Sequence, residues 1–130
     1  MPKKPSRKPS RKTLVKKLDT IFSIYIRRRY AKNDISECVT CGKRDHWKKM
    51  QNGHFMSRKH YATRWDEENV QVQCSSCNVF RYGEQYLFSK YLGEDKADAL
   101  LIKSRSIEKF SDVDLIDLIE LYTNKVNNLS

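Results

Sequence analysis

The chain has 130 residues, and its 26 Lys and Arg against 16 Asp and Glu give a formal net charge of +10. That length fits one domain, and with 38% hydrophobic and 32% charged residues the core will be small. No apolar run of about 18 residues is present, which excludes a membrane-spanning helix. The basic N-terminus also lacks the apolar stretch of a secretory signal. We therefore expect a soluble cytoplasmic protein, in which paired cysteines are metal ligands more often than disulfides.

The excess positive charge lies in the first quarter of the chain. Residues 1–36 hold 12 Lys and Arg against two acids, a net of +10, whereas residues 37–130 hold 14 of each sign. Residues 1–12 contain no aliphatic side chain after Met1, so we expect a disordered basic tail. Such a tail commonly binds a polyanion, most simply the phosphates of nucleic acid, the alternative being a solubilising or localisation tail. The expected DNA contacts in it are Lys3, Lys4, Arg7, Lys8, Arg11 and Lys12.

Residues 13–30 have the periodicity of an amphipathic helix. The apolar positions that share one face are Leu14, Leu18, Ile21, Phe22, Tyr25 and Ile26. We expect this N-terminal helix to pack its apolar stripe on the body and to turn basic side chains toward DNA. The basic residues assigned to that contact are Lys16, Lys17, Arg27 and Arg28.

The remainder of the chain divides into a cysteine-containing segment and a helical one. Residues 37–82 lack helical periodicity, so we expect turns and short strands there, with a helix that opens near Cys77. Residues 84–127 are expected to form C-terminal helices, with a stop at Gly93. The clearest start signal is Ser111, followed three residues later by an Asp that completes a capping box.

Two CxxC pairs, Cys38 with Cys41 and Cys74 with Cys77, predict a structural zinc site. Thiolates at this spacing both reach one tetrahedral ion, at about 2.3 Å from each sulfur. Buried free thiols or disulfides are the alternative. Because four cysteines leave no open coordination position, we expect this zinc to be structural and not catalytic.

His54, Asn69 and Asn78 lie between and just after the two CxxC pairs. The pattern makes sense if two short strands and a helix converge on one phosphate. A His at the end of the first strand can take a proton from water as a general base. Asn69 can hold the connecting loop by side-chain to backbone hydrogen bonds. Asn78 offers one neutral oxygen to a hard cation that keeps most of its waters, as Mg²⁺ prefers.

The segments CVTC, NGHF and CSSCN resemble the HNH, or ββα-metal, nuclease family with a structural zinc. The wider run resembles the phage NinG/Rap recombination nucleases over most of residues 13–125, through KKLDTIF, CxxCGKxxxW, GHFMSRKHYATRW, NVQVQCSSCN and GEQYLFSKYL. The resemblance implies a single α+β domain over residues 13–130, with a ββα-metal core held by zinc and flanked by N- and C-terminal helices. It also implies a metal-dependent DNA endonuclease acting on branched recombination intermediates, such as Holliday junctions or D-loops.

By position in that resemblance, His54 is the general base, Asn69 orients the loop, and Asn78 binds the catalytic Mg²⁺ or Mn²⁺. Many family members have an Asp or His metal ligand just before the base, where this chain has Gly53. Further candidates for the metal shell are, in order, His60, Asp45 and Asp66. For a phage protein the expected location is the cytoplasm of the bacterial host.

Arg58 and Arg64 flank the same loop, and either can clamp a phosphate through its fork of donors. The alternative for each is a surface ion pair with a nearby acid, Asp66, Glu67 or Glu68. Trp47 and Trp65 are expected to pack in the core, the alternative being that they stack on unpaired bases. The aromatic residues expected to pack around the zinc site and the N-terminal helix are Tyr82, Tyr86, Phe88 and Tyr91.

Two hypotheses about the function remain. The first is the endonuclease described above. The second is a zinc-stabilised DNA-binding module with no catalysis, which would not need the spacing of His54, Asn69 and Asn78. Symmetric cutting of a junction would require two active sites and hence a homodimer.

Overall fold

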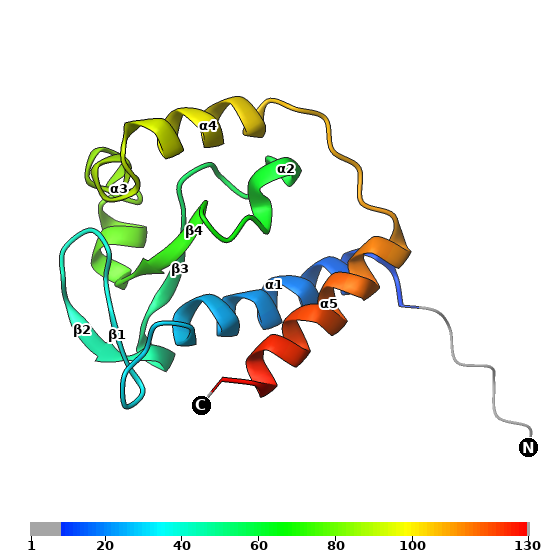
Figure 1. Cartoon of the computed structure of the whole chain (residues 1–130), viewed down its shortest axis with the longest axis horizontal. Helices are drawn as coiled ribbons and strands as arrows, with labels where there is room; N and C mark the ends of the chain where they lie inside the picture. The colour runs from blue at the N-terminus through cyan, green and yellow to red at the C-terminus, as the bar shows by residue number, and fades with distance from the viewer. Residues whose placement is uncertain (1–8, 130) are drawn as a thin grey trace, which may run out of the picture.

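A computed structural model, in which residues 9–129 are described, shows a mixed α+β arrangement (Figure 1). Two small antiparallel sheets are accompanied by five α-helices among the described residues. The elements are α1 (Arg11–Arg28), β1 (Ile35–Glu37), β2 (Arg44–His46), η1 (Trp47–Lys49), β3 (Gln51–His54), α2 (Tyr61–Arg64), β4 (Val70–Gln73), η2 (Ser76–Phe80), α3 (Gln85–Leu92), α4 (Glu94–Ser104) and α5 (Asp112–Asn127). No helix in this part of the chain has the length and apolar character needed to cross a bilayer.

Helix α1 begins earlier than its apolar spacing predicts. Ser10 is the N-cap, and its hydroxyl accepts a hydrogen bond from the backbone N–H of Thr13, so the helix starts at Arg11. The expectation that the disordered tail extends to residue 12 is therefore wrong for Arg11 and Lys12, which belong to α1. The rest of that tail, residues 1–8, lies outside the described residues.

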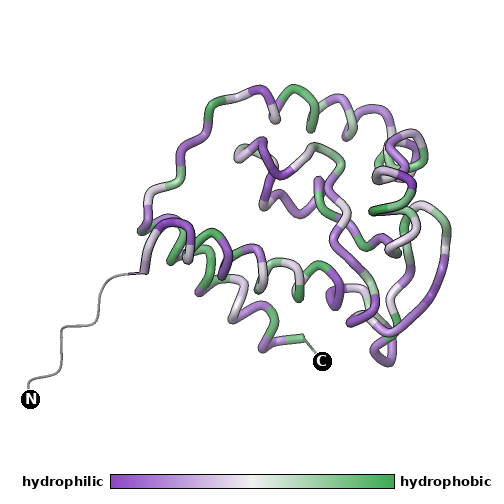
Figure 2. The backbone as a smooth tube through the Cα atoms, turned by 180° about the vertical axis from the view of Figure 1, so that it is seen from behind, coloured by the Kyte–Doolittle hydropathy of each residue, from purple (hydrophilic) through white to green (hydrophobic). Residues whose placement is uncertain are grey.

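The helices α1 and α5 lie side by side and bury their apolar stripes against each other (Figure 1). Figure 2 shows hydrophobic residues alternating with hydrophilic ones along both helices, as expected for helices buried on one side. Phe22 of α1 meets Tyr122 of α5 edge to face, with ring centroids 4.8 Å apart. The predicted start of α5 is confirmed, because Ser111 and Asp114 form a reciprocal capping box.

The second sheet positions the candidate site. Strands β3 and β4 pair antiparallel, from Gln51 opposite Gln73 to His54 opposite Val70. All four residues of β4 are buried, and Val70 belongs to the main core together with the apolar stripe of α1. His54 is the last residue of β3, so its backbone is fixed by a strand that the core holds in place.

A smaller core holds the chain that follows His54. It contains Phe88, Leu92 and Leu100 from α3 and α4, against which Phe55 and Met56 pack. The rings of Phe55 and Phe88 have centroids 5.5 Å apart. The C-terminal helices thus support the loop that leaves β3.

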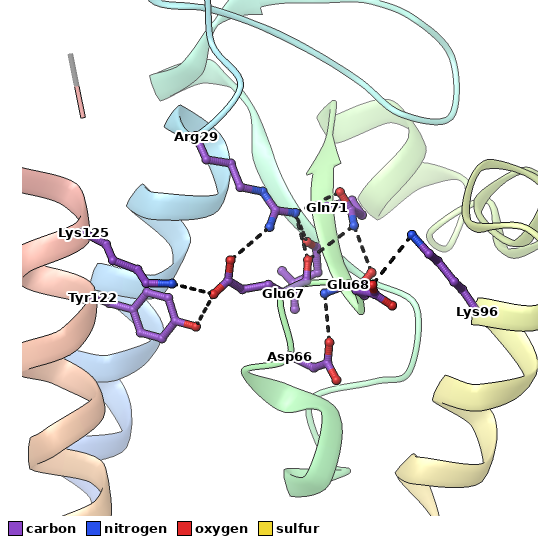
Figure 3. Close-up of polar contacts among 9 residues, drawn as sticks. Arg29, Asp66, Glu67, Glu68, Gln71, Lys96, Tyr122 and Lys125 are labelled. Carbon is purple, nitrogen blue, oxygen red and sulfur yellow. Dashed lines mark hydrogen bonds and ion pairs between the residues drawn. The ribbon is translucent and has the colours of Figure 1, made fainter. Parts of the chain in front are cut away.

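The end of α1 is joined to α5 and to the turn before β4 by a network around Arg29 and Glu67 (Figure 3). The Arg29 side chain is only 7% exposed, and it donates to the Glu67 carbonyl at 2.9 Å and to the Gln71 amide oxygen at 3.0 Å. The Glu67 carboxylate accepts hydrogen bonds from Tyr122 at 2.9 Å and from Lys125 at 3.0 Å. Arg29 therefore serves the fold.

Candidate metal centre and active site

The four cysteines come together as the CxxC spacing predicts. Their Sγ atoms all lie within 4.8 Å of one another, and those of Cys41 and Cys74 are 3.6 Å apart. A tetrahedral zinc with bonds of about 2.3 Å places its sulfurs about 3.8 Å apart. Cys38, Cys74 and Cys77 are buried and Cys41 is exposed. The cluster could hold a metal such as zinc.

Local backbone geometry prepares the thiols for this role. Each CxxC pair closes a turn, through a hydrogen bond from Gly42 N to the Cys38 carbonyl and one from Asn78 N to the Cys74 carbonyl, both 2.9 Å long. Burial raises the pKa of Cys38, but hydrogen bonds from the Thr40 hydroxyl and from backbone N–H groups outweigh it and hold that pKa at about 6. The thiolate, which is the form that binds metal, is thereby favoured at Cys38. At Cys77 burial instead raises the pKa, to about 12.

The cysteine cluster also fixes the two elements that frame the site. The first pair follows β1 and the second follows β4, and Val39 N donates to the Val72 carbonyl at 2.9 Å between them. The expected helix near Cys77 is the short π-helix η2, which carries Asn78. Asn78 is therefore held beside β3, and its Nδ2 donates to Gln51 Oε1 at 2.8 Å.

A pocket of about 580 Å³ lies where α1, β3 and η2 meet. Its polar lining includes Asp19, Asn52, His54, Arg58 and Asn78. The structure thus brings together three residues assigned from sequence to base catalysis, metal binding and phosphate binding. It also adds two that the sequence analysis missed, Asp19 and Asn52.

His54 is uncharged at neutral pH. Burial, followed by the positive charge of Arg58, lowers the pKa of His54 from 6.5 to about 4, and a hydrogen bond to the Arg64 backbone and the nearby Asp19 carboxylate oppose this only partly. A neutral imidazole has a free nitrogen lone pair, so His54 can accept a proton in the pocket.

The neutral state of His54 predicts that folding stability depends on pH. Below pH 6.5 the unfolded chain binds a proton at this imidazole while the folded chain does not, so stability falls as the pH drops from 6.5 to about 4. The whole shift corresponds to about 3 kcal/mol, at about 1.36 kcal/mol per pKa unit. Urea unfolding at a series of pH values should show this extra loss in the wild type and not in His54→Gln. Both proteins keep the four cysteines, so any loss of stability from protonation of the cysteines is the same in both. Equal pH dependence of the unfolding free energy in the two proteins would contradict the lowered pKa of His54.

Asn69 holds the loop that follows His54. Its side chain is fully buried, its Oδ1 accepts from Met56 N at 2.7 Å, and its Nδ2 donates to the carbonyls of Met56 and Thr63, each at 3.0 Å. Its carbonyl accepts from Phe55 N at 2.9 Å. Asn69 does not line the pocket, so its place is that of a positioning residue for the end of β3.

Two amide oxygens of pocket-lining residues lack a hydrogen-bond donor among the described residues. Asn78 Oδ1 accepts no hydrogen bond from residues 9–129, and neither does the buried Asn52 Oδ1. Asn52 precedes His54 by two positions in β3, and side chains at that interval share one face of a strand. This alternation is the signal that could have identified Asn52 from sequence.

Gly53 is required by packing. A Cβ atom at this position would lie 2.0 Å from Oε1 of Gln73. Gln73 is fully buried, and its Nε2 donates to the Gly83 carbonyl at 2.8 Å and to the Thr40 hydroxyl at 3.1 Å. Gln73 thus ties the cysteine cluster to the pocket wall, and the absence of a side chain at Gly53 makes room for it.

Gly53→Ala should destabilise the fold by about 1–3 kcal/mol, the usual cost of overpacking, because Gln73 cannot move without losing its two hydrogen bonds. Equilibrium urea unfolding measures the loss. The double variant Gly53→Ala/Gln73→Ala should lose much less than the sum of the two single variants, since the clash disappears. Additive losses would show that the two side chains do not compete for this space.

None of the three further metal candidates lines the pocket. His60 is the N-cap residue of α2 and makes no capping hydrogen bond through its side chain. The Asp45 carboxylate accepts from its neighbour's backbone N–H at 2.7 Å. Asp66 pairs with Lys103 at 2.6 Å. The structure thus does not place His60, Asp45 or Asp66 beside Asn78.

The acid that does reach the pocket is Asp19 of α1, which is bound by Arg64 and Trp65. Its carboxylate accepts from Arg64 Nε at 3.1 Å and Nη2 at 2.5 Å, and from Trp65 Nε1 at 3.0 Å. Arg64 also donates to the Arg58 carbonyl at 2.9 Å. The Arg64 fork is therefore occupied by Asp19 and not by Asp66 or its neighbours, whereas Arg58 lines the pocket itself.

Basic side chains gather around Trp47, near the C-terminal end of α1. The guanidinium groups of Arg27 and Arg28 lie 5.1 and 5.5 Å from the Trp47 ring centroid, and the Lys48 amine lies 5.8 Å from it. Trp47 is half-buried beneath them, whereas Trp65 packs in the core as expected. Lys16 and Lys17 are exposed on α1.

Of the four aromatic residues after η2 that the sequence predicts to pack around the zinc site and α1, only Phe88 is fully buried, and it lies in the smaller core with Leu92 and Leu100. The expectation is wrong for Tyr82, Tyr86 and Tyr91, which are 89%, 70% and 49% exposed. Hydrophobic character alone led to that expectation. The backbone conformation that turns these rings outward is not visible in the sequence.

The chain matches the family described as bacteriophage lambda NinG protein over residues 2–130. No curated protein and no solved structure matches it. Since the match covers nearly the whole chain, the protein belongs to the bacteriophage lambda NinG protein family.

Proposed function

We propose that this protein is a metal-dependent DNA endonuclease that hydrolyses phosphodiester bonds, with branched recombination intermediates of phage DNA as its substrates. The observation that carries the proposal is the shared pocket of His54, Asn78 and Arg58, which come from three segments of the chain. The order of β3, β4 and η2 around that pocket, held by the cysteine cluster, supports a ββα-metal core.

Each residue has a role that its surroundings favour. Arg58 lines the pocket beside His54 and provides a guanidinium fork for the scissile phosphate. His54, kept neutral by burial, accepts a proton from the attacking water. Asn69 holds the backbone that follows His54 and so keeps the imidazole in position.

The pocket offers oxygen donors that suit a hydrated divalent cation. Asn78 would hold Mg²⁺ or Mn²⁺ through Oδ1, and the Asn52 side chain lines the same pocket. The Asp19 carboxylate is already engaged by Arg64 and Trp65, so it contributes charge to the pocket more than coordination. When bound, such a cation supplies charge neutralisation at the phosphate and at the leaving oxygen.

DNA would lie along the basic side of the molecule. The cluster of Arg27, Arg28 and Lys48 around Trp47 and the exposed Lys16 and Lys17 offer positive charge on and beside α1. The basic residues among the first eight positions lie outside the described part of the structure. Their contribution to DNA binding is proposed from their positive charge alone.

Cleavage should require added Mg²⁺ or Mn²⁺. The test is incubation of zinc-loaded protein with supercoiled, junction, flap, nicked and linear DNA, with no divalent cation, with Mg²⁺ and with Mn²⁺. We expect products only with added cation, at a rate that saturates with its concentration. Asn78→Ala should raise the cation concentration needed, whereas Ser75→Ala, an exposed neighbour, should not.

Equal cutting with and without added cation would contradict the metal role. DNA binding with no cleavage of any substrate would favour the alternative, a zinc-stabilised binding module. Paired cuts in opposite arms of a junction, together with a dimeric mass in solution, would identify a homodimer.

A further inference from the structure

The segment that leaves η2 exposes three large aromatic side chains. Phe80, Tyr82 and Tyr86 are 76%, 89% and 70% exposed. Burying a ring of this size stabilises a fold substantially, so several neighbouring rings left in water usually mark a binding surface. We refer to these three residues as the aromatic surface.

The backbone beneath the aromatic surface is held firmly in an unusual conformation. Tyr82 and Glu84 have φ of +54° and +48°, in the left-handed region, which is unfavourable for residues other than glycine. The intervening Gly83 donates to the Cys77 carbonyl at 2.8 Å and accepts from Gln73 Nε2 at 2.8 Å. The cysteine cluster and β4 therefore fix this turn, and strain maintained in this way is typical of functional segments.

The turn also forms one wall of the candidate active site. Tyr82 and Gly83 line the same pocket as His54 and Asn78. A nucleic-acid strand whose phosphate enters this pocket would have its neighbouring nucleotides beside Tyr82. Basic residues accompany the rings, since Lys90 Nζ lies 5.3 Å from the Tyr86 ring centroid.

We propose that the aromatic surface stacks against unpaired bases of the DNA strand next to the scissile phosphate. The inference rests on the proposed nuclease function and narrows its substrate to sites that border single-stranded DNA. In an uninterrupted duplex the base faces are covered by their neighbours, whereas unpaired bases leave them open to an aromatic ring. Arg58 in the shared pocket and Lys90 beside Tyr86 provide positive charge for the phosphates of such a strand.

The test measures binding without cleavage, by fluorescence anisotropy in the absence of added divalent cation. The probes are a labelled oligothymidylate and a blunt duplex of equal length. Tyr82→Ala and Phe80→Ala should each weaken binding of the oligothymidylate about 5- to 100-fold and change duplex binding less than about twofold. Tyr82→Trp should keep the affinity. Tyr30→Ala is the matched control, because Tyr30 is 73% exposed but lines a different cavity.

Photocrosslinking to a 5-iodouracil-substituted strand gives an independent readout, with adducts expected on Tyr82 or Phe80 in the wild type. Unchanged affinity of both alanine variants, or adducts confined to other segments, would overturn the proposal. A third outcome would also overturn the proposal: the wild type is a dimer, and Tyr82→Ala makes it a monomer without changing its DNA affinity. The aromatic surface would then be a contact between two copies of the chain.

These outcomes are separable from those of the nuclease assay. If the protein binds single-stranded DNA through the aromatic surface but cuts no DNA, the proposed nuclease function is contradicted and the proposed base stacking is supported. If Tyr82→Ala cuts DNA and binds oligothymidylate as the wild type does, the proposed stacking is contradicted and the nuclease function is supported.

Discussion

His54→Ala should reduce DNA cleavage by about 10²- to 10⁴-fold, the usual contribution of a general base, while DNA binding and folding are kept. The imidazole lies in the pocket with Asn78 and Arg58, and its lowered pKa leaves it unprotonated and ready to take a proton from water. Because the charge that attracts DNA lies elsewhere, affinity should not change with the loss. Single-turnover cleavage of a labelled substrate measures the chemical step.

The matched control for this experiment is His60→Ala. His60 is also a histidine of the loop between the cysteine pairs, but it does not line the pocket, so its replacement should leave the rate unchanged. Thermal unfolding of both variants establishes that they fold. A folded His54→Ala protein that cuts as fast as the wild type would remove His54 from the mechanism, and a slow His60→Ala would restore His60 as a candidate ligand.

Cys38→Ser should abolish zinc binding and unfold the domain. The Sγ atoms of the four cysteines lie within 4.8 Å of one another, and three of them are buried at the junction of β1, β4 and η2. Structural zinc sites contribute about 10–16 kcal/mol of apparent binding free energy. That is comparable with, or larger than, the whole stability of a small domain, about 5–15 kcal/mol.

Zinc content by atomic spectroscopy should fall from one ion per chain to none in the variant, and circular dichroism should show loss of the native signal. Ser75→Ala, an exposed position between Cys74 and Cys77, should keep both. A chelator that removes the ion from the wild type should reproduce the unfolding. A well-folded Cys38→Ser protein without zinc would contradict the four-thiolate site.

Local signals made part of this structure predictable. The CxxC spacing determines which four sulfurs can meet, because each pair needs only one tight turn. The capping box at Ser111 and the apolar stripe of α1 are likewise encoded within a few residues. The pattern shared with the ββα-metal nucleases predicted His54 at the end of a strand, and His54 is the last residue of β3.

Contacts between distant segments were not predictable. Asp19 meets Arg64 across 45 positions, and only the packing of α1 against β3 and β4 brings them together. The one available hint was that Asp19 is the single acid in α1. The exposed ring of Tyr82 lies in a turn in which Tyr82 and Glu84 have positive φ, and Tyr86 follows that turn. Positive φ at residues other than glycine could not be predicted from the sequence.

Helix α1 supplies Asp19, Phe22 and Ser23 to the pocket, although it precedes the first cysteine by ten positions or more of chain. A minimal fragment of residues 37–82, transplanted into another scaffold, would keep the metal ligands and the imidazole but would leave one side of the pocket open to solvent. Any transfer of this candidate centre to another protein would therefore have to include helix α1.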